Sequence, residues 1–130
     1  LVMFNYLGPD TAKEIKGLIS EQGFIGSDMH DIGDLLASLG YADPVMNMEY
    51  INLEYENSQV LIQDILSIGL ISKFDADSKE FEEKIVNLLR LHPKFQLTLE
   101  VVYGHAWRIK KNDAKPIKIY PKETFKNGIN

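Results

Sequence analysis

Residues 95–108, which read FQLTLEVVYGHAWR, decide how this chain folds. Apolar or aromatic side chains recur at every second position, a period that is typical of a β-strand. One face of the expected strand carries Phe95, Leu97, Leu99, Val101, Tyr103, His105 and Trp107. We therefore expect residues 95–108 to be the main strand of a sheet.

Two further segments have the pattern of strands. Residues 1–7 are almost wholly apolar, which suits a strand that is buried on both faces. Residues 44–56 alternate, but the alternation changes phase between Tyr50 and Ile51, which predicts a β-bulge there. The strand-like start without an initiator Met also suggests a cut made inside a larger protein.

Four helices are expected between these strands, because each intervening segment carries apolar residues at helical spacing. The residues expected to cap the helix N-termini are, in chain order, Thr11 with Glu14, Asp28, Ser58, and Asp77 with Glu80. The first helix should run to about residue 20, and Gly40 should end the second. Strands alternating with helices predict an α/β or α+β fold.

Composition places the chain among ordinary globular domains. It has 130 residues, of which 45% are hydrophobic, and this is enough for one domain with a modest core. There is no Cys, which excludes disulfides and thiolate metal sites. Three scattered His predict no metal site, and no apolar run has the ~20 residues of a membrane span. A cytoplasmic protein without membrane contact is expected.

The net charge of -5 is unevenly distributed. From Arg108 to Asn130 there are seven Lys or Arg and two Asp or Glu, a sum of +5, so the rest carries -10. The tail at 110–130 could attract an acidic partner, or it could simply be a solvated tail. No nucleic-acid binding is expected, because the acidic body of the chain would repel phosphate.

Three segments together resemble the malonyl-[acyl-carrier protein] O-methyltransferases of biotin synthesis, the BioC family. They are FNYLGPDT at 4–11, DMHDIGDLL at 28–36 running into GYADPVM at 40–46, and EVVYGHAW at 100–107. Their order and spacing match as well, and the resemblance covers residues 1–108.

The resemblance implies a class I methyltransferase, whose Rossmann-like α/β fold has a seven-stranded sheet. This chain would be the C-terminal half, spanning 1–109, with 57–93 as an insert on the substrate side and 110–130 as a basic tail. The implied sheet is three-stranded and mixed, in the family order 5-7-6, with about four helices. Residues 95–108 would then lie between the other strands and run antiparallel to both.

The implied reaction moves a methyl group from S-adenosylmethionine to the free carboxylate of malonyl on acyl carrier protein. That carboxylate is ionised at neutral pH, so no general base is required. The cofactor site would lie in the missing N-terminal half, because this chain has no G-x-G-x-x-G loop, and the fragment alone would be inactive. Two alternatives are an assembly-factor-like protein and a non-catalytic interaction module built on a methyltransferase remnant.

The expected substrate-binding residues are Tyr6, Thr11 and His30, with no certain catalytic residue. Ligands in open α/β sheets bind beyond the carboxyl ends of parallel strands, where all three would lie. The alternatives are an ordinary capped turn for Tyr6 and Thr11, and an exposed helix-capping residue for His30. His105 and Trp107 lie on a strand that points the other way, so we expect them to pack in the core.

The first strand also predicts association. If its neighbours are absent, residues 1–7 present an unpaired apolar edge without Lys, Arg, Glu or Pro. A two-fold axis lets such an edge pair with itself. A homodimer through residues 1–7, or through the apolar surface beside them, is therefore expected.

Overall fold

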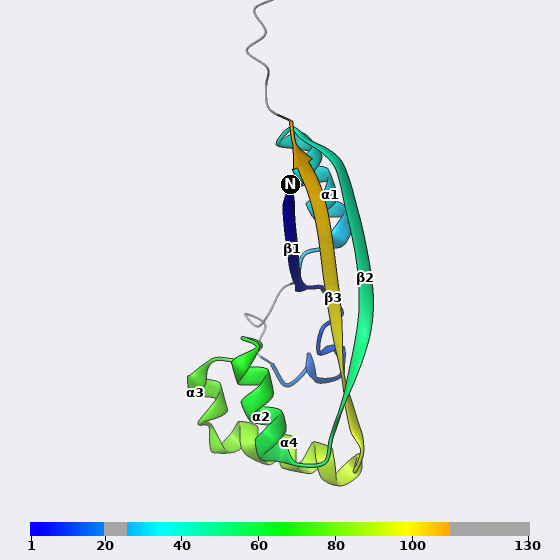
Figure 1. Cartoon of the computed structure of the whole chain (residues 1–130). Coiled ribbons are helices and arrows are strands. Elements are labelled where there is room, and N and C mark those ends of the chain that lie inside the picture. Colours follow the sequence, from blue (N-terminus) through cyan, green and yellow to red (C-terminus); the bar gives the residue numbers. More distant parts are fainter. Residues whose placement is uncertain (20–25, 110–130) are drawn as a thin grey trace, which may run out of the picture.

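A computed structural model describes residues 1–19 and 26–109. Within them the chain forms a three-stranded sheet, four α-helices and a short 3-10 helix. Figure 1 shows a long, narrow sheet with α1 beside its upper half and with α2, α3 and α4 gathered at its lower end. The tail expected at 110–130 lies outside the described residues.

The sheet has β3 (Phe95–Arg108) at its centre, with β1 (Val2–Leu7) on one side and β2 (Tyr41–Tyr55) on the other. β3 runs antiparallel to both neighbours. The central position predicted for residues 95–108 is confirmed. The described sheet is antiparallel rather than mixed, because β3 separates the two strands that run in the same direction.

The α-helices are α1 (Met29–Ser38), α2 (Ser58–Ser67), α3 (Lys73–Ala76) and α4 (Lys79–Leu91). The Asp28 side chain caps α1 as predicted, accepting a hydrogen bond from the His30 backbone N–H at 2.8 Å. Gly40 follows α1 with a φ of 81°, a left-handed conformation that glycine adopts without steric cost.

Two helices have caps one residue away from the predicted positions. Asn57, not Ser58, caps α2 by accepting hydrogen bonds from two backbone N–H groups of its first turn. Ser78, not Asp77, caps α4 and accepts from the Phe81 N–H. In each case a second good capping residue stands beside the predicted one, and the backbone geometry selects between them.

The first predicted helix is not formed over the described residues. Only the 3-10 turn η1 (Lys13–Ile15) is present, and the residue before it, Ala12, has a left-handed φ of 55° and no capping side chain. Thr11 and Glu14 do not make a capping box, because both side chains are hydrogen-bonded to β3 instead. A tertiary contact has replaced the local one.

The sheet is covered on opposite faces at its two ends. The odd-numbered side chains of β3, from Phe95 to Trp107, define what we call the Trp107 face; its lower end is buried against α2 and α4. On the opposite face, Val102 and Ala106 of the upper half are fully buried, and α1 lies beside this half in contact with β2. The lower core comprises Tyr55, Leu61, Ile62, Ile65, Phe81, Ile85, Leu89, Phe95 and Leu97.

This change of covered face explains why the predicted bulge was wrong. β2 pairs with β3 without interruption from Val45 to Tyr55, so the register does not slip at Tyr50 and Ile51. The irregularity lies between Ala42 and Val45, where Asp43 has a φ of 47°. The apolar alternation changes phase along β2 because the buried face of the sheet changes. In the lower half the Trp107 face is buried, and in the upper half the opposite face is buried.

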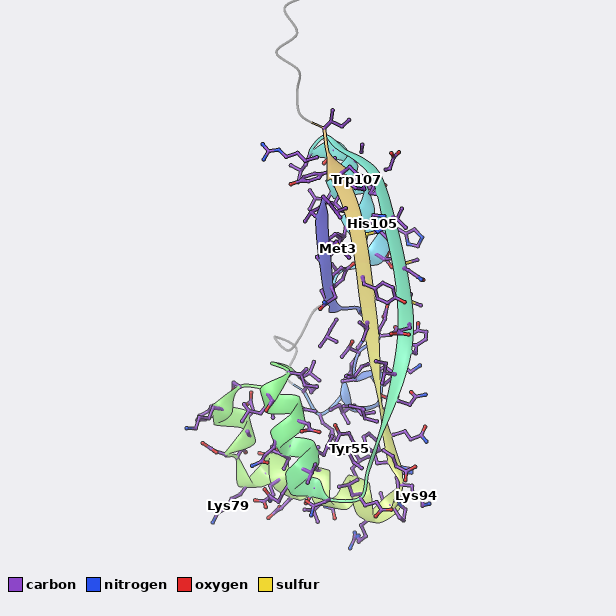
Figure 2. All side chains as sticks on the ribbon, viewed as in Figure 1. Met3, Tyr55, Lys79, Lys94, His105 and Trp107 are labelled. Carbon is purple, nitrogen blue, oxygen red and sulfur yellow. The ribbon has the colours of Figure 1, made fainter. Side chains whose placement is uncertain are left out.

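The prediction that Trp107 packs in the core was also wrong. It shares a face with Phe95 and Leu97, but 52% of its surface is exposed, and His105 is only partly buried. Figure 2 shows Met3, His105 and Trp107 along the upper half of the sheet, far from Tyr55 in the lower core. Two-residue periodicity identified the face correctly, but not how far along the strand that face is covered.

Candidate functional site

The segment that follows β1 is fastened to β3 by hydrogen bonds to Glu100. The Gly8 backbone N–H donates to the Glu100 carbonyl at 2.8 Å. The hydroxyl of Thr11 donates to the same carbonyl at 3.3 Å and accepts from the Glu100 N–H at 3.1 Å. Thr11 therefore takes the place of a strand residue on the edge of β3, beyond the point where β1 ends.

The side chain of Glu100 also contacts the turn that follows β1. Glu100 is buried, and its carboxylate accepts a hydrogen bond from the Asp10 backbone N–H at 2.7 Å. A Cβ at Gly8 would lie 2.5 Å from the carboxyl carbon of Glu100, closer than real Cβ atoms approach. Glycine at position 8 is what lets the turn pass over this carboxylate.

Tyr6, predicted to bind substrate, ends in a buried hydroxyl that has no hydrogen-bond partner among the described residues. Burial raises the pKa of Tyr6, and the negative charges of Asp28, Glu100 and Asp31 raise it further. The phenol therefore stays protonated at neutral pH. It offers an unused donor at the carboxyl end of β1.

His30 lies at the N-terminus of α1 and is bound to its own cap. Its Nδ1 lies 2.8 Å from the Asp28 carboxylate, which also accepts from the His30 backbone N–H. These two hydrogen bonds, the backbone one first, lower the pKa of Asp28. The imidazole is exposed to solvent, and Asp28 limits the directions in which it can point.

The structure brings the three predicted residues to the carboxyl end of β1, near the middle of β3, but their side chains differ in burial and in hydrogen bonding. Tyr6 is close enough to Asp28 and Asp31, at the start of α1, for their negative charges to raise its pKa. Thr11 is buried, and its hydroxyl proton and one lone pair are already used on β3. Of the three, Tyr6 has the unpaired buried donor and His30 the exposed ring.

Sequence reasoning missed Glu100 and Tyr50. The Tyr50 hydroxyl donates to the Asp10 carboxylate at 2.8 Å, and this bond raises the pKa of Tyr50. The Lys13 ammonium lies 5.7 Å from the centre of the Tyr50 ring. The signal that could have found Glu100 is an acidic residue in the middle of the strand predicted to be central, since a buried carboxylate needs partners.

The charge around this site is largely negative. The carboxyl groups of Asp10, Asp28, Asp31 and Glu100 lie near the carboxyl end of β1. Lys16 is beside them, with its ammonium group donating to the Pro9 carbonyl at 2.6 Å. An anionic ligand therefore depends on hydrogen-bond donors here, because the nearby carboxylates oppose its charge.

Over the described ranges 1–19 and 26–109, no group of three or more His, Asp or Glu side chains could hold a metal ion. No helix in the same ranges has the length and apolar character that crossing a membrane requires.

No family model matches the chain. It is similar to the malonyl-[acyl-carrier protein] O-methyltransferase of Gallionella capsiferriformans, with 38% identity over 91% of this chain and 47% of the relative. The enzymes of the same name from Nitrosospira multiformis and Legionella pneumophila are 38% and 35% identical, over 83% and 82% of this chain. The chain spans 39% and 43% of these two relatives. It is thus a relative of the malonyl-[acyl-carrier protein] O-methyltransferases and corresponds to less than half of their length.

Proposed function

We propose that this chain is the substrate-facing part of a methyltransferase that esterifies the free carboxylate of malonyl-acyl carrier protein. The methyl donor would be S-adenosylmethionine, and the reaction would serve biotin synthesis in the cytoplasm. The observation that carries this proposal is the similarity to seven proteins of one name, at 30–38% identity over most of this chain. An assembly-factor-like protein or a non-catalytic interaction module is not favoured by relatives that are all named as O-methyltransferases.

The sheet order supports a specific place for the chain in a methyltransferase domain. We assign β1, β3 and β2 to the fifth, seventh and sixth strands of the class I fold. In that assignment the carboxyl ends of β1 and β2 point toward the substrate. β2 ends at the lower end of the sheet in Figure 1, beside α2, α3 and α4, whereas β1 ends midway along the sheet and points the same way, so we propose that residues 57–93 form a substrate-side insert.

The residues of this chain do not fit a site for the methyl donor. The sequence contains no G-x-G-x-x-G loop, and the described end of β1 carries carboxyl groups around one buried phenol. We therefore place the donor site in the part of the relatives that lies outside the match. On this proposal the chain alone has no methyltransferase activity.

The residues at the end of β1 would bind and orient the acceptor. A malonyl carboxylate is ionised at neutral pH and acts as the nucleophile without a base, so the protein has to align it and exclude water. We propose that the unpaired Tyr6 hydroxyl and the exposed His30 ring donate hydrogen bonds to it. Thr11 would contribute indirectly, by holding the wall of the site against β3.

The experiment that tests this proposal uses a chimera in which the chain replaces the matching part of the Gallionella enzyme. The expected result is methylation of malonyl-carrier protein and none of acetyl-carrier protein, which lacks the free carboxylate. A folded chimera that binds S-adenosylmethionine but does not methylate malonyl-carrier protein would contradict the proposal.

Two variants of the chimera test the residues. Tyr6→Phe and His30→Ala should each lower kcat/KM for malonyl-carrier protein by about 10-fold to 100-fold, the size of one lost charge-stabilising contact. Ser38→Ala, at the exposed C-terminal end of α1 and outside residues 57–93, is the control and should leave kcat/KM unchanged. Wild-type kcat/KM in a folded Tyr6→Phe and a folded His30→Ala chimera would leave both residues with structural roles only.

A further inference from the structure

Glu100 is the one charged side chain that is buried among the described residues. It stands in the middle of β3 with 5% of its surface exposed, and neither ion pair found in the same residues includes it. Its carboxylate accepts a hydrogen bond from the Asp10 backbone N–H at 2.7 Å. Burying a charge without an opposite charge is unfavourable, so the stability of the sheet does not account for this carboxylate.

Glu100 begins a series of close contacts between three segments of the chain. The first contact is with Gly8, where an added Cβ would lie 2.5–2.8 Å from the Glu100 side chain. The second is between Gly8 and Gly26, where an added Cβ on Gly26 would lie 2.6 Å from the Pro9 nitrogen and would also meet the Gly8 carbonyl carbon. Backbone thus lies directly on backbone, which only glycine at position 26 allows. A change at Glu100 therefore reaches Gly26 through a single peptide.

Both proposed hydrogen-bond donors are attached to this series of contacts. Tyr6 precedes Gly8 by two residues at the end of β1, and its buried hydroxyl has no partner among the described residues. His30 follows Gly26 by four residues, and the Asp28 cap binds both its backbone N–H and its ring. The spacing between the two donors is thus set where Gly8 meets Gly26.

The charge of Glu100 does not help a malonyl carboxylate to bind, because like charges repel. Its length, in contrast, has a clear geometric role. From β3 the side chain reaches the Asp10 N–H, and it lies against Gly8 without room for one more carbon atom. Aspartate would be shorter by one C–C bond, ~1.5 Å, and would leave the Asp10 N–H without this acceptor. The observed contacts thus depend on reach and not on charge.

We propose that Glu100 is a positioning residue for the acceptor. Through Gly8 and Gly26 it holds Tyr6 and His30 at the spacing at which both donate hydrogen bonds to the malonyl carboxylate. The identity of the acceptor rests on the function proposed above, whereas the positional role rests on these contacts. Displacing an aligned group by about 1 Å costs on the order of 100-fold in rate, so the effect of losing this support should appear in kcat.

Two conservative variants of the chimera separate reach from charge. Glu100→Asp keeps the charge but loses the reach, and should lower kcat for malonyl-carrier protein by about 10-fold to 100-fold. Glu100→Gln keeps the reach, because its carbonyl oxygen can accept from the Asp10 N–H, and should keep kcat within about 3-fold. The KM of Glu100→Gln should not rise, because a negative charge near the substrate has been removed.

A third variant controls for loss of stability. Ala106→Gly weakens β3 at a fully buried position that pairs with Val2, at the opposite end of β1 from Tyr6. It should lower the melting temperature and leave kcat unchanged. Gly26→Ala takes the place of Glu100→Asp if that variant does not fold, and should cause the same fall in kcat.

The nuclear Overhauser contact between the α-protons of Gly8 and Gly26 tests the position without any activity. It should persist in the Glu100→Gln form of the 130-residue chain and disappear in the Glu100→Asp form. Contact in both forms, equal kcat values for the two Glu100 variants, or an equal fall in kcat for Ala106→Gly would overturn the proposal. An inactive wild-type chimera would instead contradict the proposed reaction, and the contact between the two glycines would still decide the role of Glu100.

Discussion

The Thr11 hydroxyl accepts a hydrogen bond from the Glu100 N–H at 3.1 Å and donates one to the Glu100 carbonyl at 3.3 Å. One side chain thus contacts both backbone groups of a buried residue on the edge of β3, and the Gly8 N–H shares the carbonyl at 2.8 Å. It does so at the place where β1 has ended and no further strand residue is available. The same contact draws residues 8–14 along β3 and prevents Thr11 from capping a helix.

Removing this hydroxyl should destabilise the protein although the side-chain shape is kept. Thr11→Val leaves the Glu100 N–H without its acceptor, whereas the Glu100 carbonyl keeps the Gly8 N–H; an unsatisfied buried polar group costs about 1–3 kcal/mol. Thr11→Ser retains the hydroxyl and is the control. Urea unfolding of the two variants measures the difference, and equal free energies of unfolding would show that the contact contributes no stability.

Gly8→Ala should be destabilising for a steric reason. Its new Cβ would meet the Glu100 side chain at 2.5–2.8 Å, and overpacking of this kind costs about 1–3 kcal/mol. Gly17→Ala is the control, because an added Cβ there meets nothing within 4 Å. Adding Glu100→Ala to Gly8→Ala should recover part of the loss caused by crowding. Thermal melting would contradict this account if the Gly8 and Gly17 variants melted together.

Trp107→Ala should have little effect on the stability of the isolated chain. Trp107 is half exposed, and substitutions at such surface positions usually change stability by about 0.5 kcal/mol or less. Phe95→Ala, on the same strand and face but buried, should cost about 3–5 kcal/mol. Denaturant titration compares the two, and a similar loss for both would mean that the upper Trp107 face is already covered.

Stability should fall at alkaline pH because of Tyr55. Burial, together with the hydrogen bond that its hydroxyl donates to Asp64 at 2.8 Å, raises the pKa of Tyr55 from 10.0 to about 12. The unfolded chain loses this proton first, so the contribution of Tyr55 is complete below pH 10 and is lost as the pH rises to about 12. Tyr55→Phe should flatten the decline in stability over this interval. Parallel pH profiles for the variant and the wild type would disprove the role of Tyr55.

Much of the fold could be predicted from the sequence, because it depends on local periodicity. The alternation of apolar and polar residues predicted the strand at 95–108, and Asp28 and Gly40 predicted the two ends of α1. The missing first helix has a clear physical cause, which is that a tertiary contact overrode a local signal. Thr11 and Glu14 had the spacing of a capping box, yet β3 binds both side chains.

The candidate site was less predictable than the fold. Tyr6 and His30 were named because they follow the right elements, but no local pattern shows that the Tyr6 hydroxyl is buried without a partner. Glu100 is far from Gly8 in sequence, so their contact depends on the register between β1 and β3. Exposure of Trp107 depends on where the covering helices end, and periodicity carries no information about that.

The most direct test of the central claim is the intact mass of malonyl-carrier protein after incubation with the chimera and S-adenosylmethionine. We predict a gain of one methyl group in place of a proton, lost again on mild alkaline hydrolysis of the ester, and no gain with the 130-residue chain alone. An unchanged mass with a folded, donor-binding chimera, or a methyl group that survives ester hydrolysis, would contradict the claim that this chain forms the acceptor side of a carboxylate methyltransferase.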